Sequence, residues 1–256
     1  MASKHIGICI QARCNSVRLP GKVTLPLGST TILGSALQRL KTISVDPNLK
    51  SGFEFTMVVL TDAASSTTIQ PIAEAQDFAV LEGDSINVLS RFQKAARDYH
   101  FDFLIRATAD NPFVIHELIP EQILSGVRRG MDYTVFNALP YGGGVEFITA
   151  QALLNLPEHT LTPYDYEHVT PYIYNHPEDY SLLRLSPPDW ARYPDVRITV
   201  DYQEDYQRIE RIYQSLLPPT RESLNDTMNL GGAHILPSSR EIISAFQRLY
   251  QQSEVL

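Results

Sequence analysis

Cysteine is scarce in this chain: its 256 residues include only two, Cys9 and Cys14. Two cysteines at this spacing provide neither a disulfide framework nor the ligand set of a zinc site. The histidines other than His168 show no metal-ligand spacing either. We therefore expect Cys9 to pack in the core and Cys14 to be a free thiol in a loop, which fits a reducing cytoplasm.

Long apolar runs are also absent. No segment approaches the length of a membrane span, and the opening residues MASKHIGICI alternate like a strand, unlike a signal peptide. Basic residues are outnumbered, with 21 Lys and Arg against 29 Asp and Glu, so the net charge is -8. That balance argues against a protein that coats nucleic acid. We expect a cytoplasmic protein that binds a small anionic ligand, without membrane or nucleic-acid partners.

Apolar strand-like runs alternate with helical patterns through the first half of the chain. The expected strands are residues 4–12, 53–60, 78–82, 103–107 and 133–137. The expected helices between them are residues 32–43, 69–76, 86–99 and 115–129. Strands that alternate with helices are typical of an α/β protein, in which a mostly parallel sheet lies between two helical layers.

The second half of the chain is less regular. Strands are expected at residues 145–148, 182–185 and 196–200, and helices from Thr149, at 163–175, at 202–217 and from about Ser238. Pro218 and Pro219 are expected to end the helix at 202–217. The chain shows no repeat, low-complexity tract or clear linker, and its length suits one core. We therefore expect residues 1–256 to form a single domain.

The most informative segment follows the first expected strand. Residues 13–22, RCNSVRLPGK, carry the three cations Arg13, Arg18 and Lys22 together with Gly21. In α/β proteins, ligands bind beyond the carboxyl ends of parallel strands. A loop there with two guanidinium groups, an ammonium group and free backbone N–H groups suits a polyphosphate. On these residues alone, a solvated basic turn is an equal alternative.

Two carboxylates follow expected strands later in the chain. Asp110 lies in the segment RATADNP, just after residues 103–107, and Asp201 ends the segment RITVD. Together with the cationic loop, they suit a site for Mg²⁺ and a nucleoside triphosphate, because hard oxygens hold the ion and the phosphates complete its shell. Asp110 can also be a helix N-cap or a turn residue, and Asp201 can be a helix N-cap, and these alternatives stay open.

Five segments together resemble a known family. They are IQARCNSVRLPGK at 10–22, EGDSINVLSR at 82–91, RATADNP at 106–112, EHVTPY at 167–172 and RITVDYQEDY at 197–206. Their order and spacing resemble the cytidylyltransferase family that makes CMP-activated acidic sugars, and most closely its spore-coat polysaccharide SpsF-like branch. The resemblance covers about residues 4–215. It implies a three-layer Rossmann-like sandwich of the nucleotide-diphospho-sugar transferase type.

The resemblance also implies roles for individual residues. Arg13, Arg18 and Lys22 would hold the phosphates of CTP, and Asp110 and Asp201 would hold Mg²⁺. The remaining assignments are Ala12 and Gly21 for close approach of the backbone to the nucleotide, Thr61, Asp62, Ser85 and Asn87 for the border of the cytosine with Arg91 nearby, and Glu146, His168 and Tyr172 for the acceptor.

Some of these assignments have structural alternatives. His168 can be a structural histidine, Glu146 can pair with an arginine, and Arg91 can be the partner of a nearby aspartate. The chain also departs from the family pattern at Ala109 and Asn111, and Cys14-Asn15 replaces a commoner Met-Gly pair. These departures remove no cation or carboxylate, so they bear on the acceptor and on the geometry of the loop.

The expected reaction is Mg²⁺-dependent transfer of CMP from CTP to an anionic acceptor, with release of pyrophosphate. The acceptor would be an acidic sugar, a sugar or polyol phosphate, or a phosphonate. A homodimer is expected, built largely by an insertion at about residues 145–185 with help from the C-terminal helix. One alternative is a nucleotide-sugar-dependent glycosyltransferase of the same fold, although Asp110-Asn111-Pro112 lacks the second acid of a D-x-D motif. The other alternative is a non-catalytic nucleotide-binding protein.

Overall fold

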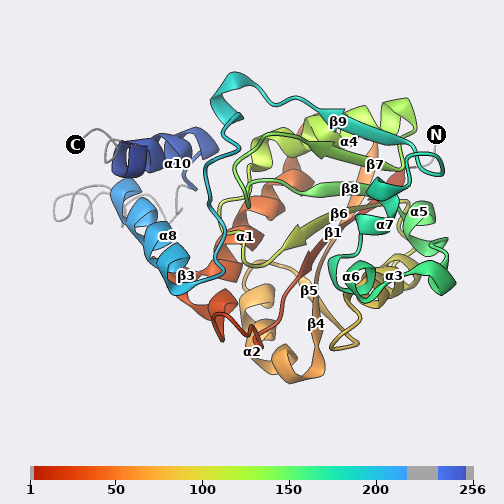
Figure 1. The fold of residues 1–256 in the computed structure, drawn as a ribbon, viewed down its shortest axis with the longest axis horizontal. Helices are drawn as coiled ribbons and strands as arrows, with labels where there is room; N and C mark the ends of the chain where they lie inside the picture. Colours follow the sequence, from red (N-terminus) through yellow and green to blue (C-terminus); the bar gives the residue numbers. More distant parts are fainter. Residues whose placement is uncertain (1–2, 218–235, 252–256) are drawn as a thin grey trace.

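The computed structural model describes residues 3–217 and 236–251. Its central sheet has seven strands in the spatial order β5-β4-β1-β6-β8-β7-β9 (Figure 1). The strands are β1 (Lys4–Gln11), β4 (Phe53–Asp62), β5 (Ala79–Gly83), β6 (Phe103–Thr108), β7 (Tyr133–Phe136), β8 (Glu146–Thr149) and β9 (Leu182–Leu185). Strand β8 pairs antiparallel with β6 and β7, and the other pairs in this sheet are parallel. The predicted mostly parallel α/β sheet is confirmed.

Strand β1 lies in the interior of the sheet, between β4 and β6, and both of its faces are apolar. Ile6, Ile8 and Ile10 pack on one face, whereas Cys9 packs on the other. This double burial is typical of a central parallel strand. Cys9 is buried as predicted, and burial raises the pKa of its thiol above the ordinary value.

Helices cover both faces of the sheet. On the face of Ile6, Ile8 and Ile10 lie α1 (Ile32–Lys41), α2 (Ala63–Glu74) and α4 (Ile119–Arg129). On the face of Cys9 lie α3 (Val88–Asp98), α5 (Ala150–Leu154), α6 (Pro163–His168) and α7 (Pro171–Asn175). The chain passes from β1 to β4 and β5 on one side and returns to β6 on the other side of β1. The crevice at such a reversal is where α/β proteins bind ligands.

Two predicted elements of the second half are wrong. The expected single helix at 163–175 is split into α6 and α7 by Val169, which has φ 75 and ψ -52. Pro171 begins α7, and a proline inside a continuous helix would clash with the preceding turn. Val169 is a buried β-branched residue at positive φ, a conformation that the surrounding packing must hold in place.

The expected strand at 196–200 is an extended segment outside the sheet ladder. One isolated bridge joins Tyr141 to Arg197, and the amide of Val200 donates to the carbonyl of Asp110 at 2.9 Å. The alternating apolar residues of this segment, Val196, Ile198 and Val200, are buried against α8 (Gln203–Leu216) and α10 (Ser239–Phe246) instead. The apolar pattern therefore reflects packing on helices, although it resembles that of a strand.

Helices α8 and α10 pack side by side at one end of the sheet (Figure 1). Pro218 and Pro219, expected to end the first of them, lie outside the described residues. Shorter elements occur along the rest of the chain. They are the hairpin β2 (Pro26–Leu27) and β3 (Thr30–Thr31), and the 3-10 turns η1 (Lys22–Thr24), η2 (Thr42–Val45), η3 (His116–Leu118), η4 (Glu158–Thr160) and η5 (Asp189–Ala191). In the ranges 3–217 and 236–251, no helix has the length and apolar character needed to cross a membrane.

Candidate active site

The basic loop after β1 folds back on itself. The amides of Ser16 and Gly21 both donate to the carbonyl of Cys14, at 3.0 and 2.9 Å. Gly21 has φ 70, a conformation that glycine adopts without strain, and it leads directly into η1. As a result Lys22, the first residue of η1, is turned inward and is only 8% exposed.

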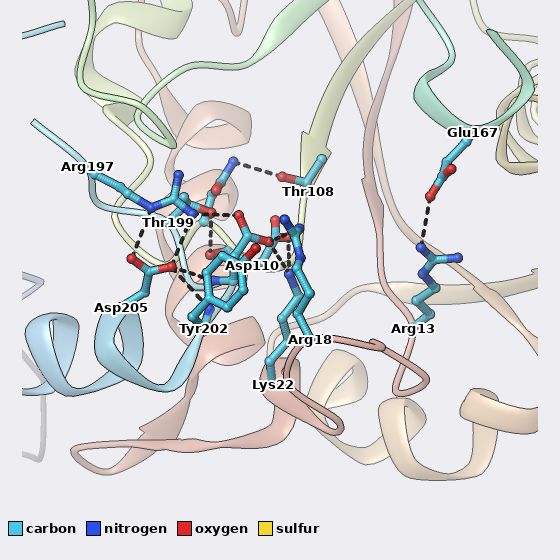
Figure 2. Close-up of polar contacts among 12 residues, drawn as sticks. Arg13, Arg18, Lys22, Thr108, Asp110, Glu167, Arg197, Thr199, Tyr202 and Asp205 are labelled. Carbon is cyan, nitrogen blue, oxygen red and sulfur yellow. Dashed lines mark hydrogen bonds and ion pairs between the residues drawn. The ribbon is translucent and has the colours of Figure 1, made fainter. Parts of the chain in front are cut away.

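The structure brings Asp110 and Asp201 together around Lys22. The Nζ of Lys22 lies 2.6 Å from Oδ2 of Asp110 and 2.9 Å from Oδ1 of Asp201. Arg18 Nη2 lies 2.5 Å from the same Oδ1 of Asp201, and its guanidinium lies over the ring of Tyr202. These side chains converge from three segments of the chain (Figure 2).

The second carboxylate oxygen of Asp201, Oδ2, is bound by a residue outside the Lys22 cluster. Arg197 Nη2 donates to Oδ2 of Asp201 at 2.7 Å, and Arg197 also donates to both oxygens of Asp205 at 3.0 and 3.1 Å. Asp205 accepts from the backbone amides of Asp201 and Tyr202 at 3.0 and 3.1 Å (Figure 2). Arg197 and Asp205 therefore fix the orientation of the Asp201 carboxylate.

These contacts shift the pKa values of both carboxyl groups downward. Burial acts to raise the pKa of Asp201, but the ammonium of Lys22 and the guanidinium of Arg197 outweigh it and hold this pKa below its ordinary value. For Asp205 burial again acts upward, whereas Arg197 and the two backbone amides lower the pKa to about 2. Both side chains are therefore anionic at neutral pH.

A cavity of about 790 Å³ opens beside this cluster. Its walls come from the end of β1 and the following loop, the end of β6, residues 136–144, α3 and α6. Arg13 on the loop reaches across to α6, where its Nη2 lies 3.1 Å from Oε1 of Glu167 (Figure 2). Each of the three loop cations thus pairs with a carboxylate.

Residues 7–230 match the family model described as cytidylyltransferase. The chain belongs to the cytidylyltransferase family. The spore coat polysaccharide biosynthesis protein SpsF of Bacillus subtilis (strain 168) is 34% identical to it over 206 residues, which cover 80% of this chain and 85% of SpsF. These matches confirm the resemblance drawn from the sequence motifs, and the chain is a CTP-dependent nucleotidyltransferase.

Solved structures agree on the fold. A cytidylyltransferase from Leptospira borgpetersenii serovar Hardjo-bovis (strain JB197) aligns with a TM-score of 0.74 and 27% identity, over 90% of this chain and 95% of that chain. CMP:2-keto-3-deoxy-manno-octonic acid synthetase, solved with CTP, aligns with a TM-score of 0.60 and 13% identity, over 84% of this chain and 100% of that chain. The Rossmann-like class predicted for this cytidylyltransferase is confirmed.

Most residues expected near the cytosine have structural partners. Asp62 and Asn87 are the N-caps of α2 and α3, since their side chains accept from the amides of Ser65 and Ser90 at 2.8 and 2.9 Å. Neither is part of the cavity wall, and nor are the other expected residues Thr61 and Ser85. Arg91 does line the cavity, as does Ala12. Of the residues expected around the cytosine, the cavity wall therefore contains Arg91 alone.

Arg91 fills the space between α3 and the loop before it. Its Nε and Nη2 donate to the carbonyls of Asp84 and Ser85 at 2.5 and 3.1 Å, and Asp62 lies 3.9 Å from Nη2. Burial lowers the pKa of Arg91. The aspartate partner anticipated for Arg91 is present, so this side chain positions the loop and borders the cavity at the same time.

Among the residues expected near the acceptor, His168 lines the cavity and the other two do not. Tyr172 stacks on His176, with the ring centroids 3.9 Å apart. Glu146 accepts from the hydroxyls of Tyr133 and Thr170 at 2.6 and 2.8 Å.

The second oxygen of Glu146 pairs with Arg106. Both oxygens of Glu146 are therefore engaged, and this carboxylate ties β6, β7 and β8 to the start of α7. Arg106 itself lines the cavity. The arginine pairing weighed for Glu146 from the sequence is what the structure contains.

Sequence reasoning missed other residues of the site. Gln11 and Arg106 line the cavity, and within the described residues Gln11 Oε1 and Arg106 Nε are buried without hydrogen-bond partners. Residues 136–144 form another wall, in which Gly142 has φ 93 and would clash with Thr199 if it carried a Cβ. The signals were present, because Arg106 belongs to the RATADNP motif and the three-glycine run marks a close approach.

Proposed function

We propose that this cytidylyltransferase transfers CMP from CTP to an anionic acceptor in a Mg²⁺-dependent reaction that releases pyrophosphate. The observation that supports it most is the cluster in which Lys22 and Arg18 meet Asp110 and Asp201 at the edge of a 790 Å³ cavity. Cations and carboxylates at one point are what a metal-triphosphate complex requires.

The loop cations are the triphosphate ligands of this proposal. Arg13, Arg18 and Lys22 all line the cavity, and charge-assisted contacts to phosphate oxygens would replace their contacts to carboxylates. Ala12 lines the cavity with only a methyl group, so we expect the nucleotide to come close there, whereas Gly21 turns the loop and is not part of the cavity wall. The backbone amide of Ala12 donates to the carbonyl of Leu60 at 3.0 Å, so the carbonyl and the methyl group of Ala12 are the groups that remain for contact with the nucleotide.

The donor set fits a divalent metal ion. Asp110 Oδ2 and Asp201 Oδ1 share a cation, Lys22 Nζ, so both oxygens are oriented toward one point. The described part of the chain holds no group of three or more His, Cys, Asp and Glu side chains suited to a metal. Phosphate oxygens and water would therefore complete the coordination shell. When bound, Mg²⁺ supplies Lewis-acid polarisation of the phosphates and neutralises developing charge.

The acceptor would occupy the remaining cavity, between residues 136–144 and α6. An acceptor oxygen attacks the α-phosphorus of CTP in line, the bond to the bridging oxygen breaks, and pyrophosphate leaves. His168 and Arg106 line this side, and His168 is the residue that we propose contacts the acceptor. The name of the 34% identical SpsF, a spore coat polysaccharide biosynthesis protein, supports a sugar among the proposed acceptors.

A pyrophosphate-release assay tests the proposal. The enzyme is incubated with Mg²⁺, one of the four nucleoside triphosphates and a panel of acidic sugars, sugar phosphates and phosphonates. CTP should support release, and ATP and GTP should not. Omission of Mg²⁺ in the presence of a chelator should abolish release. Pyrophosphate release with ATP or GTP but not with CTP, or full release in the presence of the chelator, would contradict the proposal.

A further inference from the structure

The cations of the basic loop all have carboxylate partners. Arg13 pairs with Glu167, Arg18 with Asp201, and Lys22 with both Asp110 and Asp201. These partners differ in kind, because Glu167 belongs to α6, whereas the two aspartates are the proposed metal ligands. Lys22 therefore occupies a special position among the loop cations.

Lys22 lies where a metal ion would have to bind. Its ammonium group contacts one oxygen of each aspartate, and its side chain is only 10% exposed. The other oxygen of Asp201 is held by Arg197, which is itself held by Asp205, so it is not free to turn toward an ion. A divalent cation at this point must displace the ammonium group, since like charges repel strongly in a partly buried site.

The triphosphate removes this obstacle in the proposed function. Its oxygens offer Lys22 a stronger negative partner on the cavity side, so the ammonium group can leave the two aspartates. The aspartates then lack a cation, and two carboxylates close together favour binding one. The same exchange would release Arg18, whose side chain is 51% exposed and is therefore the weaker barrier.

We propose that Lys22 is an internal counter-ion that keeps divalent cations out of the site formed by Asp110 and Asp201 until a triphosphate engages it. Metal binding and nucleotide binding are then positively coupled, and this coupling is reciprocal. The inference rests on the proposed metal and triphosphate roles of these residues, and it is independent of the acceptor and of the nucleobase.

Binding of Mn²⁺ to the nucleotide-free protein tests the coupling, with free Mn²⁺ followed by its electron paramagnetic resonance signal. The variant Lys22→Met removes the charge and keeps the length of the side chain. It should bind Mn²⁺ at least ten times more tightly than the wild type. Lys22→Arg keeps the charge and should stay weak.

Arg13→Met is the matched control. It removes one positive charge from the same loop, but its partner is Glu167, so its Mn²⁺ affinity should stay within twofold of the wild type. The double variant Lys22→Met/Asp201→Asn should lose the gain of Lys22→Met, because the ion would then lack one of its two carboxylates. Mn²⁺ should raise the melting temperature of Lys22→Met, and not that of the wild type.

Three results would overturn the inference: tight Mn²⁺ binding by the nucleotide-free wild type, an equal gain in Arg13→Met, or a gain that survives Asp201→Asn. If Lys22→Met does not fold, Lys22→Gln takes its place. If neither folds, the melting temperature of the nucleotide-free wild type decides alone, and a rise with Mn²⁺ overturns the inference. The pyrophosphate assay is separate, so a wild type that binds Mn²⁺ tightly and still releases pyrophosphate from CTP would refute the coupling alone.

Discussion

Single residues decide whether the cluster around Lys22 is a catalytic site. Neither Asp110 nor Asp201 is a helix N-cap: Tyr202 is the N-cap of α8, and Asp110 lies in the turn after β6. The capping alternative weighed from the sequence is therefore absent from the structure, whereas the turn alternative for Asp110 is present. What remains is the charge of each carboxylate and its position beside the cavity.

The substitutions Asp110→Asn and Asp201→Asn isolate that charge. Each should leave a folded protein and lower pyrophosphate release about a hundredfold or more, about 3 kcal/mol in the barrier, because the amide lacks the charge that holds Mg²⁺. Pyrophosphate release at saturating CTP gives the rate, and the melting temperature reports folding. Asp46→Asn is the control, since Asp46 caps an exposed turn at the amide of Asn48. Near-normal turnover in either site variant would remove that residue from the metal site.

At the scale of elements, the end of the 196–200 segment and the start of α8 form one unit. Asp205 joins them, because it closes the first turn of α8 and accepts from Arg197, Arg208 and two backbone amides. Asp205 is 4% exposed, so these contacts are shielded from water. The position of Asp201 depends on this unit more than on the central sheet.

Replacing Asp205 by Ala should lower the free energy of unfolding at pH 7. The pKa of Asp205 falls from 3.8 to about 2 on folding, which corresponds to about 2 kcal/mol of stability above pH 4. Because the folded pKa is the lower one, this contribution is complete above about pH 4 and is lost as the pH falls toward 2. Urea unfolding at pH 7 and pH 3 measures it. A difference between wild type and variant that grows at pH 3 would contradict this role.

The elements also show what sequence can and cannot predict. Strand β1 and helix α3 were predicted within two residues because their apolar residues follow the periods of a strand and a helix. The split at Val169 was missed because a positive φ at valine depends on surrounding packing. The 196–200 segment was missed because an alternating apolar pattern does not reveal whether the segment pairs with a strand or packs on helices.

The residues of the site also differ in whether the sequence around them or contacts with distant residues reveal their role. Asp110, Asp201 and the loop cations were predicted because each follows an apolar segment. For Asp201 that segment, residues 196–200, lies outside the sheet ladder. Arg197, Asp205 and Glu167 were not predicted as site residues, since their importance comes from ion pairs across the fold. Glu167 and Arg13 are 154 positions apart, and no spacing rule connects them.

At the scale of the whole molecule, the 145–185 segment is where we expect a second copy of the chain to bind. The 145–185 segment ends in β9, which lies at the edge of the central sheet and pairs with β7 alone among the described strands. The same segment is rich in tyrosine, and Tyr164 is 57% exposed. Aromatic side chains are enriched at protein interfaces, and an edge strand can accept a further partner.

We therefore predict a homodimer that buries the 145–185 segment, with a contribution from α10. Light scattering at micromolar concentration should give twice the mass of the chain. Dilution to monomer should then increase amide hydrogen exchange in residues 145–185, whereas exchange in β1, which lies between β4 and β6, should not change. A monomer at micromolar concentration would refute the prediction. A dimer whose dilution leaves exchange in residues 145–185 unchanged would place the interface on another surface.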